Sequence, residues 1–526
     1  MTARTATAEL GAAVSVRTIR SFIARHRRRS WTDWYSAGFG LLIAGIYLSD
    51  LLASPFSRLT TSAARAAATQ TAEIQAVAGG GLVIGAGAGL LLLAQAFGPV
   101  ALSPADASWL LLSPLGRRAV LRRPALAALL LATLAGALLG ALALAMAGPY
   151  LRREGGSLPA SWLILATVAG AGCCLAAVAV QALAQPRELP RSVARGAWAA
   201  VAVIAGFGAL AGARWTALSR GVTTVFGGLS TPAFDTAAIA ALALAGLACA
   251  LLWRALDSFP ASVLRTDSAR SGRALTAAGF LNFSLLFWIA EDNHWRGRLL
   301  PSRPWPRMPP ALVLAWVDWR RLSRRPGPLA VVAVAAVVPA LAGAAFTGRA
   351  RGVLIAAALI AGALAAALQA ATAIRRDVDN PTLLRLLGVR TERVLVARAV
   401  LPVLLATGWL ALALTLLCTV GVLPGWWWPL MALAGPGIAA GALRLARTAP
   451  INPADRGPDL PMGNTPPWMI SRLLSVLLGA IGGWPLISVV RHGQVHPGNV
   501  VTQLVVSAVV LGLYLFVAGT WPRFQE

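Results

Sequence analysis

The sequence contains no lysine, because all 46 of its Lys+Arg positions are arginine. Only 12% of the residues are charged and 57% are apolar, whereas a soluble protein has roughly 25% charged residues. This composition excludes a soluble globular enzyme, and it excludes a disordered chain, which needs low hydrophobicity and a high charge density. The absence of lysine also excludes the phosphate-binding loop GxxxxGK[ST], so the chain is not itself a P-loop ATPase.

Cysteine is also scarce, with four residues that all lie in apolar segments. Their spacing and setting fit neither a disulfide framework nor a zinc site. The net charge of +27 would favour nucleic acid in a soluble protein. Here the arginines border apolar runs, where they are typical of topology signals and anionic-lipid contacts, so we predict membrane lipids as partners and no nucleic acid. The preference for Ala and Arg indicates a GC-rich bacterial genome, and hence a bacterial plasma membrane.

The apolar runs predict an all-α, polytopic membrane helical bundle. A span needs about 20 mostly apolar residues to cross the bilayer. That window gives twelve transmembrane helices, at residues 35–54, 76–97, 124–148, 160–184, 194–213, 233–253, 327–347, 352–374, 394–421, 425–443, 469–490 and 500–521. The segments between them alternate between arginine-rich and arginine-poor, which predicts a multi-pass chain with both termini cytoplasmic.

Two further segments suit the membrane surface rather than its interior. Residues 1–30 contain an amphipathic N-terminal helix, with Val16, Ile19 and Phe22 on one face. Residues 274–290 are apolar but short, and they lie in the arginine-rich segment 261–315. We therefore expect residues 261–315 to be a cytoplasmic linker that carries an interfacial helix.

An internal repeat divides the predicted spans into two groups. The pattern WxDW stands at residues 31–34, before the first span, and again at residues 316–319, before the seventh. Each half then holds six spans, an even number, so the two copies have the same orientation. The sequence thus predicts two parallel six-helix repeats, over residues 31–260 and 316–526.

A short helix is predicted in the cytoplasmic loop between the second and third spans of each half. The two loops cover residues 101–123 and 375–398, and each contains a run of leucines flanked by charged residues. Such a helix must bury its apolar side, either against the bundle or inner leaflet or in a groove of a cytoplasmic partner. The pattern alone favours neither alternative.

The run LSPADASWLLLSPLGRRAVL at residues 102–121 resembles the coupling loop of ABC exporter permeases. The second loop is a degenerate copy, in which the arginine pair becomes Arg390 and Arg393. In that family a separate ATPase chain holds ATP and Mg, and a twelve-span permease resembles two fused half-permeases. The resemblance therefore implies a cytoplasmic ABC-type ATPase partner in two copies, one per half, and no cofactor on this chain.

The resemblance also implies which residues meet the ATPase. Leu111 or Leu112 and Leu384 or Leu387 would be the apolar anchors. The full set combines these leucines with the flanking charged residues: Asp106, Leu111, Leu112, Leu115, Arg117, Arg118, Asp377, Asp379, Leu384, Leu387 and Arg390.

Few residues in the sequence suit catalysis or ion coupling. No predicted span has a carboxylate near its middle, and the polar groups there are amides, which we expect to form interhelical hydrogen bonds. Asp377 and Asp379 form a close carboxylate pair, which helix capping against neighbouring arginines explains. His492 and His496 are four residues apart but lack a neighbouring carboxylate, so no metal site is expected.

These observations predict the membrane permease subunit of an ATP-driven exporter, with no enzyme activity of its own. Because no titratable group is buried in a span, we expect the energy to enter mechanically through the loops. The apolar helices favour an amphipathic or lipid-like cargo. The alternative is a non-transporting membrane assembly or regulatory subunit, or a lipid-modifying membrane enzyme.

Overall fold

A bilayer offers no hydrogen bonds to the backbone, so an apolar run that crosses it must be helical. The computed structural model describes residues 69–98, 100, 102, 104–109, 116–151, 160–185, 231–279, 310–324, 326–346, 348–379, 391–425, 428–447 and 467–520, and these residues form helices joined by short turns. The chain divides into two compact units, unit 1 (1–275) and unit 2 (276–526).

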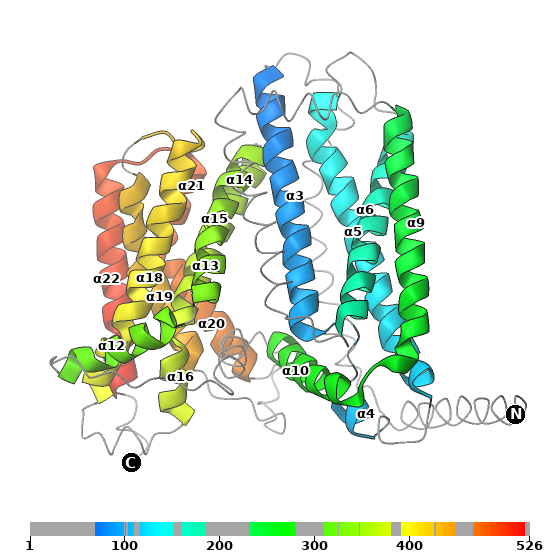
Figure 1. Ribbon diagram of the computed structural model, residues 1–526. Helices are drawn as coiled ribbons and strands as arrows, with labels where there is room; N and C mark the ends of the chain where they lie inside the picture. Colours follow the sequence, from blue (N-terminus) through cyan, green and yellow to red (C-terminus); the bar gives the residue numbers. More distant parts are fainter. Residues whose placement is uncertain are drawn as a thin grey trace, which may run out of the picture. The chain divides into compact units, whose positions relative to one another are not determined.

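The described helices of unit 1 are α3 (Thr69–Phe97), the short α4 (Pro104–Trp109), α5 (Arg117–Leu151), α6 (Ala160–Ala184), α9 (Thr231–Ala255), η4 (Leu256–Ser258) and α10 (Ala261–Gly279). Four long helices, α3, α5, α6 and α9, stand side by side, and α4 and α10 lie across their lower end (Figure 1). Helix α6 packs against both α5 and α9. Helix α5 has 35 residues and at 1.5 Å per residue is about 50 Å long, well over the ~30 Å of hydrocarbon, so its arginine-bearing start lies beyond the apolar core.

Unit 2 contains α12 (Pro310–Ser323), α13 (Pro326–Ala335), α14 (Val337–Ala345), α15 (Gly348–Ala370), α16 (Thr372–Asp379), α18 (Thr391–Thr419), η5 (Trp428–Ala434), α19 (Gly435–Arg447), α20 (Pro467–Gly482), α21 (Trp484–His492) and α22 (Pro497–Thr520). Helix α18 packs against α15 and α19, and α19 packs against α20 and α22. A Cβ on Gly437 of α19 would lie 2.7 Å from Cα of Gly482 in α20, so this close helix packing requires glycine.

The prediction of a helical membrane bundle is confirmed. Seven helices among the described residues are long and apolar enough to span a membrane: Arg117–Met146, Ser161–Ala184, Ala238–Ser258, Arg351–Ala370, Glu392–Thr419, Trp428–Arg447 and Pro497–Ala518. A bent pair, Ser471–Gly482 with Trp484–His492, makes eight if it is one span. The predicted spans at 35–54 and 194–213, and the N-terminal helix within 1–30, lie outside the described residues.

Two predicted spans differ in the structure from continuous helices, whereas the predicted span 76–97 lies within the single helix α3. The span predicted at 327–347 is divided into α13 and α14 at Ala336, and the span predicted at 469–490 bends by 59° between α20 and α21. Hydropathy does not detect such breaks, because the residues on both sides remain apolar.

A glutamine on the neighbouring helix α22 explains how the 59° bend is tolerated. Oε1 of Gln503 accepts a hydrogen bond from the Leu486 N–H at 2.9 Å, and its Nε2 donates to the Gly482 carbonyl at 2.7 Å. Gln503 therefore satisfies backbone groups that the break would leave unpaired in an apolar setting. The expected interhelical role of the buried amides is confirmed here, and also at Gln181, whose Nε2 donates to the Leu91 carbonyl at 3.2 Å.

Candidate functional site

The loops between the second and third predicted spans of each half are fastened to their units by polar contacts. In unit 2 this loop begins with α16, and α18 follows it; in unit 1 it contains α4, and α5 follows it. We call the contacts at α16 the ionic clamp, made of Asp318, Asp377 and Arg398. We call those at α4 the neutral clamp, made of the hydrogen bonds that Gln185 and Ser268 form with Val100 and Leu102.

Arg398 is the centre of the ionic clamp. It lies in the first turns of α18, and only 7% of its surface is exposed. Nε of Arg398 donates to Oδ2 of Asp377 at 3.0 Å, and its Nη2 donates to Oδ1 of the same carboxylate at 3.2 Å. Its Nη1 donates to Oδ1 of Asp318. This fork geometry is characteristic of a bidentate arginine–carboxylate pair, and it joins α16, α12 and α18 through one side chain.

Each carboxylate of the ionic clamp lies where an unpaired negative charge would be destabilising. Asp377 lies in the last turn of α16, where the helix dipole disfavours a negative charge. Asp318 is only 5% exposed. Burial raises the pKa of the Asp318 carboxyl, and the guanidinium groups of Arg398 and Arg321 oppose that rise. Arg398 thus compensates two carboxylates that the fold would otherwise leave in unfavourable positions.

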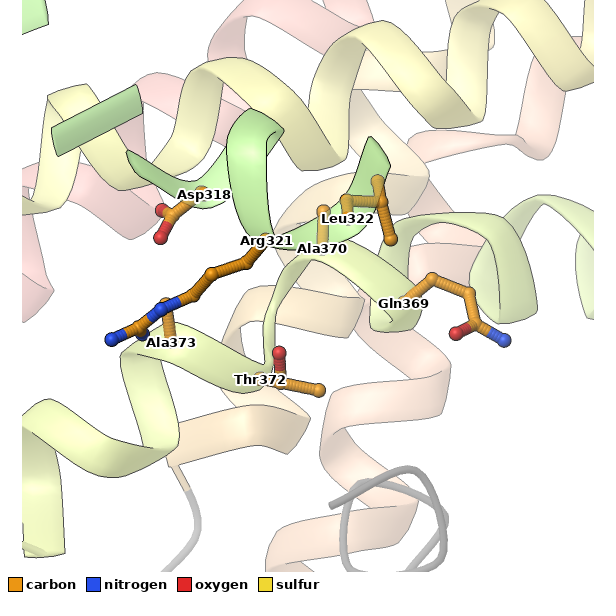
Figure 2. A pocket seen from close by; sticks show the side chains of 7 residues that line it. All are labelled: Asp318, Arg321, Leu322, Gln369, Ala370, Thr372 and Ala373. Atoms are coloured by element: carbon orange, nitrogen blue, oxygen red, sulfur yellow. The ribbon is translucent and has the colours of Figure 1, made fainter. Parts of the chain in front are cut away.

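A small cavity lies beside the ionic clamp, between α12 and the corner where α15 ends and α16 begins. Figure 2 shows its lining: Asp318, Arg321, Leu322, Gln369, Ala370, Thr372 and Ala373. Its volume is about 10 Å³, close to the room that one water molecule needs. Oδ2 of Asp318 has no hydrogen-bond partner among the described residues. The space suits a solvent molecule and is too small for a transported cargo.

The neutral clamp holds the loop of unit 1 mainly through amide and hydroxyl groups. Gln185 accepts a hydrogen bond from the Val100 N–H at 3.4 Å and donates to the Val100 carbonyl at 3.3 Å. The Leu102 N–H donates to Oγ of Ser268 at 3.1 Å. Val100 and Leu102 also belong to a buried apolar cluster that includes Leu121 of α5. The start of this loop is therefore part of the unit 1 core.

Helix α10 supplies one side of the neutral clamp. Its Asp267 is 2% exposed and accepts a hydrogen bond from Nε2 of Gln185 at 2.7 Å. In Figure 1, α10 lies at the same end of unit 1 as α4. The predicted interfacial helix at 274–290 overlaps α10 only over residues 274–279, and the larger part of α10, residues 261–273, precedes the predicted segment.

The start of α5 is tied to the end of α9 by two arginines. Nη1 of Arg117 donates to the Phe259 carbonyl at 2.6 Å, and Nη2 of Arg118 lies 2.7 Å from Oδ2 of Asp257. Asp257 also accepts a hydrogen bond at 3.1 Å from the backbone N–H of Arg118, and so caps the first turn of α5. The Arg118–Asp257 pair is about half exposed, with side-chain exposures of 45% and 53%, so it contributes little to stability.

The structure brings together only some of the predicted site residues. Arg117 and Arg118 contact the end of α9, Asp377 belongs to the ionic clamp, and Asp106 is half-buried in α4. Asp379 ends α16. The remaining predicted residues lie outside the described part of the chain: Leu111, Leu112, Leu115, Leu384, Leu387 and Arg390.

Some contributors were missed from the sequence. Asp377 pairs with Arg398 on another helix, a partner that its sequence neighbours do not indicate. Asp318, Arg398 and Asp257 were not among the predicted site residues. Asp318 had a usable signal, since it is the aspartate of the second WxDW motif. Among the described residues, no group of three His, Cys, Asp or Glu side chains could hold a metal ion.

The apolar helices define the chain as a helical membrane protein. It belongs to a family of unknown function, DUF6297, which matches residues 71–453. No curated protein and no solved structure matches the chain.

Proposed function

We propose that the protein is the membrane permease subunit of an ATP-driven exporter, energised by a separate cytoplasmic ATPase chain. The observation that carries this proposal is the ionic clamp, in which Arg398 joins the loop helix α16 to both α12 and α18. A force applied to this loop would move α12 and the long helix α18 together. A permease driven from outside the membrane needs such a connection between its loops and its spans.

The proposed architecture is twelve spans in two parallel six-helix repeats. The order of packing supports it. In unit 1, α3 packs on α5, α5 on α6, and α6 on α9. In unit 2, α15 packs on α18, α18 on η5 and α19, and α19 on α22. These helices stand at corresponding places after the two WxDW motifs, so similar neighbours follow from similar sequence order.

The two loops are the proposed docking sites for two ATPase copies, with ATP and Mg held by the partner. The resemblance of residues 102–121 to the coupling loop of ABC exporter permeases supports this assignment. The clamps fit the same role, because a docking loop must be anchored on its membrane side. The proposed orientation places both loops and both termini in the cytoplasm of a bacterium.

The proposed cargo is amphipathic or lipid-like. Charged side chains are scarce in the described spans, and where Arg398 enters one, it is already bound to two carboxylates. A hydrophilic ion would meet few groups able to replace its hydration shell. An apolar molecule that enters from the bilayer needs no such replacement.

The alternative is a non-transporting assembly or regulatory subunit, or a lipid-modifying membrane enzyme. Such an enzyme would need an available acid or base. Asp257 and Asp377 both have an arginine partner, which disfavours that role for either carboxylate.

The test is to purify the tagged full-length protein from its native host and to identify the proteins that accompany it. We expect an ATPase with a lysine-containing phosphate-binding loop, and ATP hydrolysis that amphipathic compounds stimulate after reconstitution. A preparation that contains no ATPase, or transport driven by a proton gradient without ATP, would contradict the proposal.

A further inference from the structure

One end of unit 1 carries exposed arginines that have no acidic partner in the part of the chain that the structure describes. Arg122 and Arg123 lie in the first turns of α5, and Arg254 lies in the last turn of α9. All three side chains are exposed, and no carboxylate among the described residues forms an ion pair with them. Asp257, three residues after Arg254, is already paired with Arg118. The local positive charge is therefore not neutralised by the described part of the chain.

An aromatic residue links these arginines across the two helices. The guanidinium of Arg122 lies over the ring of Trp253 at 5.9 Å from its centroid, within reach of a cation–π interaction. Stacking uses the face of a guanidinium and leaves the N–H groups on its edge available, and these groups suit the oxygens of a phosphate. Trp253 is half-buried. It immediately precedes Arg254, so Arg122 of α5 contacts the end of α9 that carries Arg254.

An exposed apolar stripe on α5 leads directly to Arg122. Leucines recur at every fourth position after Arg122, and each lies next to the one before it in a row that turns about 40° round the helix at each step. They are Leu126, Leu130, Leu134 and Leu138, with 40%, 64%, 68% and 43% of their surface exposed. The sixteen positions from Arg122 to Leu138 rise about 24 Å, which exceeds the ~15 Å depth of one leaflet.

Helix α9 carries a second stripe that leads to Arg254. Leu244, Leu247 and Leu251 are exposed by 61%, 58% and 47%, and they precede Arg254 at helical spacing. Both helices pack on α6. Apolar surface that ends in positive charge on two helices matches a molecule with acyl chains and a negative headgroup.

We propose that this surface binds an anionic phospholipid. Its phosphate contacts Arg122, Arg123 and Arg254, and its acyl chains lie along the leucine stripes of α5 and α9. An isolated arginine at the end of a span would interact with any anionic surface. Here Arg122 lies over Trp253 at the end of α9 that carries Arg254, and two apolar stripes lead to this end of unit 1, so the proposed site takes one bound molecule.

Native mass spectrometry of the purified full-length chain tests this site, with phosphatidylglycerol and phosphatidylcholine as probes. Wild-type protein should retain phosphatidylglycerol in preference to phosphatidylcholine. Each arginine near a charged lipid contributes about a fivefold gain in binding. The triple variant R122Q/R123Q/R254Q should therefore bind phosphatidylglycerol about a hundredfold more weakly. The charge-conserving variant R122K/R123K/R254K should keep most of the binding.

The matched control is R491Q, which neutralises an exposed arginine at the end of α21 in unit 2. It should bind phosphatidylglycerol as the wild type does. If the triple variant does not fold, R254Q alone should still weaken binding about fivefold. Equal retention of both lipids by the wild type would overturn the proposal, and so would unchanged binding by the folded triple variant or by R254Q. The measurement uses no ATPase and is independent of the proposed transport function.

Discussion

The two clamped loops hold corresponding places in their units but use different chemistry. The loop of unit 1 is held by hydrogen bonds from Gln185, which also donates to the buried Asp267, by a hydrogen bond to Ser268 and by the burial of Val100 and Leu102. The loop of unit 2 is held by two buried ion pairs that share Arg398. Shortening a buried apolar side chain lowers the free energy of unfolding in steps that depend on the atoms removed. Removing one partner of a buried ion pair leaves the other charge uncompensated and costs more. We therefore expect a single substitution to destabilise the ionic clamp more than the neutral clamp.

The largest effect should follow R398Q. It leaves the carboxylates of Asp318 and Asp377 without their shared partner, and losing one partner of a buried pair costs about 3–5 kcal/mol. Thermal unfolding in detergent should show the destabilisation, and amide hydrogen exchange should rise in α16 but not in α4. R398K keeps the charge and should have a smaller effect. A destabilisation below about 1 kcal/mol would show that the ionic clamp is not a structural joint.

A comparable effect on partner binding should follow the substitutions L111D and L384D. Truncating an apolar anchor at an interface costs about 2 kcal/mol or more, and a buried charge adds to that cost. Each variant should reduce the ATPase that co-purifies, and comparing the two shows whether both loops contribute. Thermal unfolding should be unchanged, because the predicted anchors face the partner. Normal ATPase recovery from both variants would assign these leucines to packing within the membrane protein.

A smaller effect should follow Q185A in unit 1. It leaves the buried N–H of Val100 unpaired and removes the hydrogen bond to Asp267, at a cost of about 1–3 kcal/mol. Hydrogen exchange should rise in the α4 region and stay unchanged in α16. Q181A is the matched control, since it removes a glutamine four residues earlier whose bond to Leu91 lies between spans. Equal responses of the two variants in α4 would contradict the neutral clamp.

The smallest effect should follow D257N. The Arg118–Asp257 pair is about half exposed and should contribute under about 1 kcal/mol. The loss should shrink further at high salt, because exposed charges are screened. Thermal unfolding at two salt concentrations measures both changes. A loss as large as that of R398Q would show that exposure is a poor guide to the strength of these pairs.

The helices could be predicted from the sequence, because an apolar run that crosses a bilayer must be helical to satisfy its backbone hydrogen bonds. The sequence was less informative about where helices break. The bend at Gly483 depends on Gln503, which lies twenty positions further along the chain and reaches across to the break. No local pattern at the bend reveals such a partner.

The site was predicted less completely than the helices. The WxDW repeat contains Asp318 but was read only as a sign of duplication, and the partner of Asp318, Arg398, is 80 residues away and next to a predicted span. Pairing over that distance depends on how α12 and α18 pack. The sequence drew attention to Asp377 because Asp379 is close to it in the chain. In the structure Asp377 accepts hydrogen bonds from the same Arg398.

Photo-crosslinking in the native host tests the central claim most directly. A crosslinking amino acid at position 111 or 384 would mark whatever contacts each loop in the cell, and mass spectrometry would identify it. The proposed function predicts that both positions capture an ATPase with a phosphate-binding loop. Crosslinks only to lipid or to this chain itself, at both positions, would contradict it.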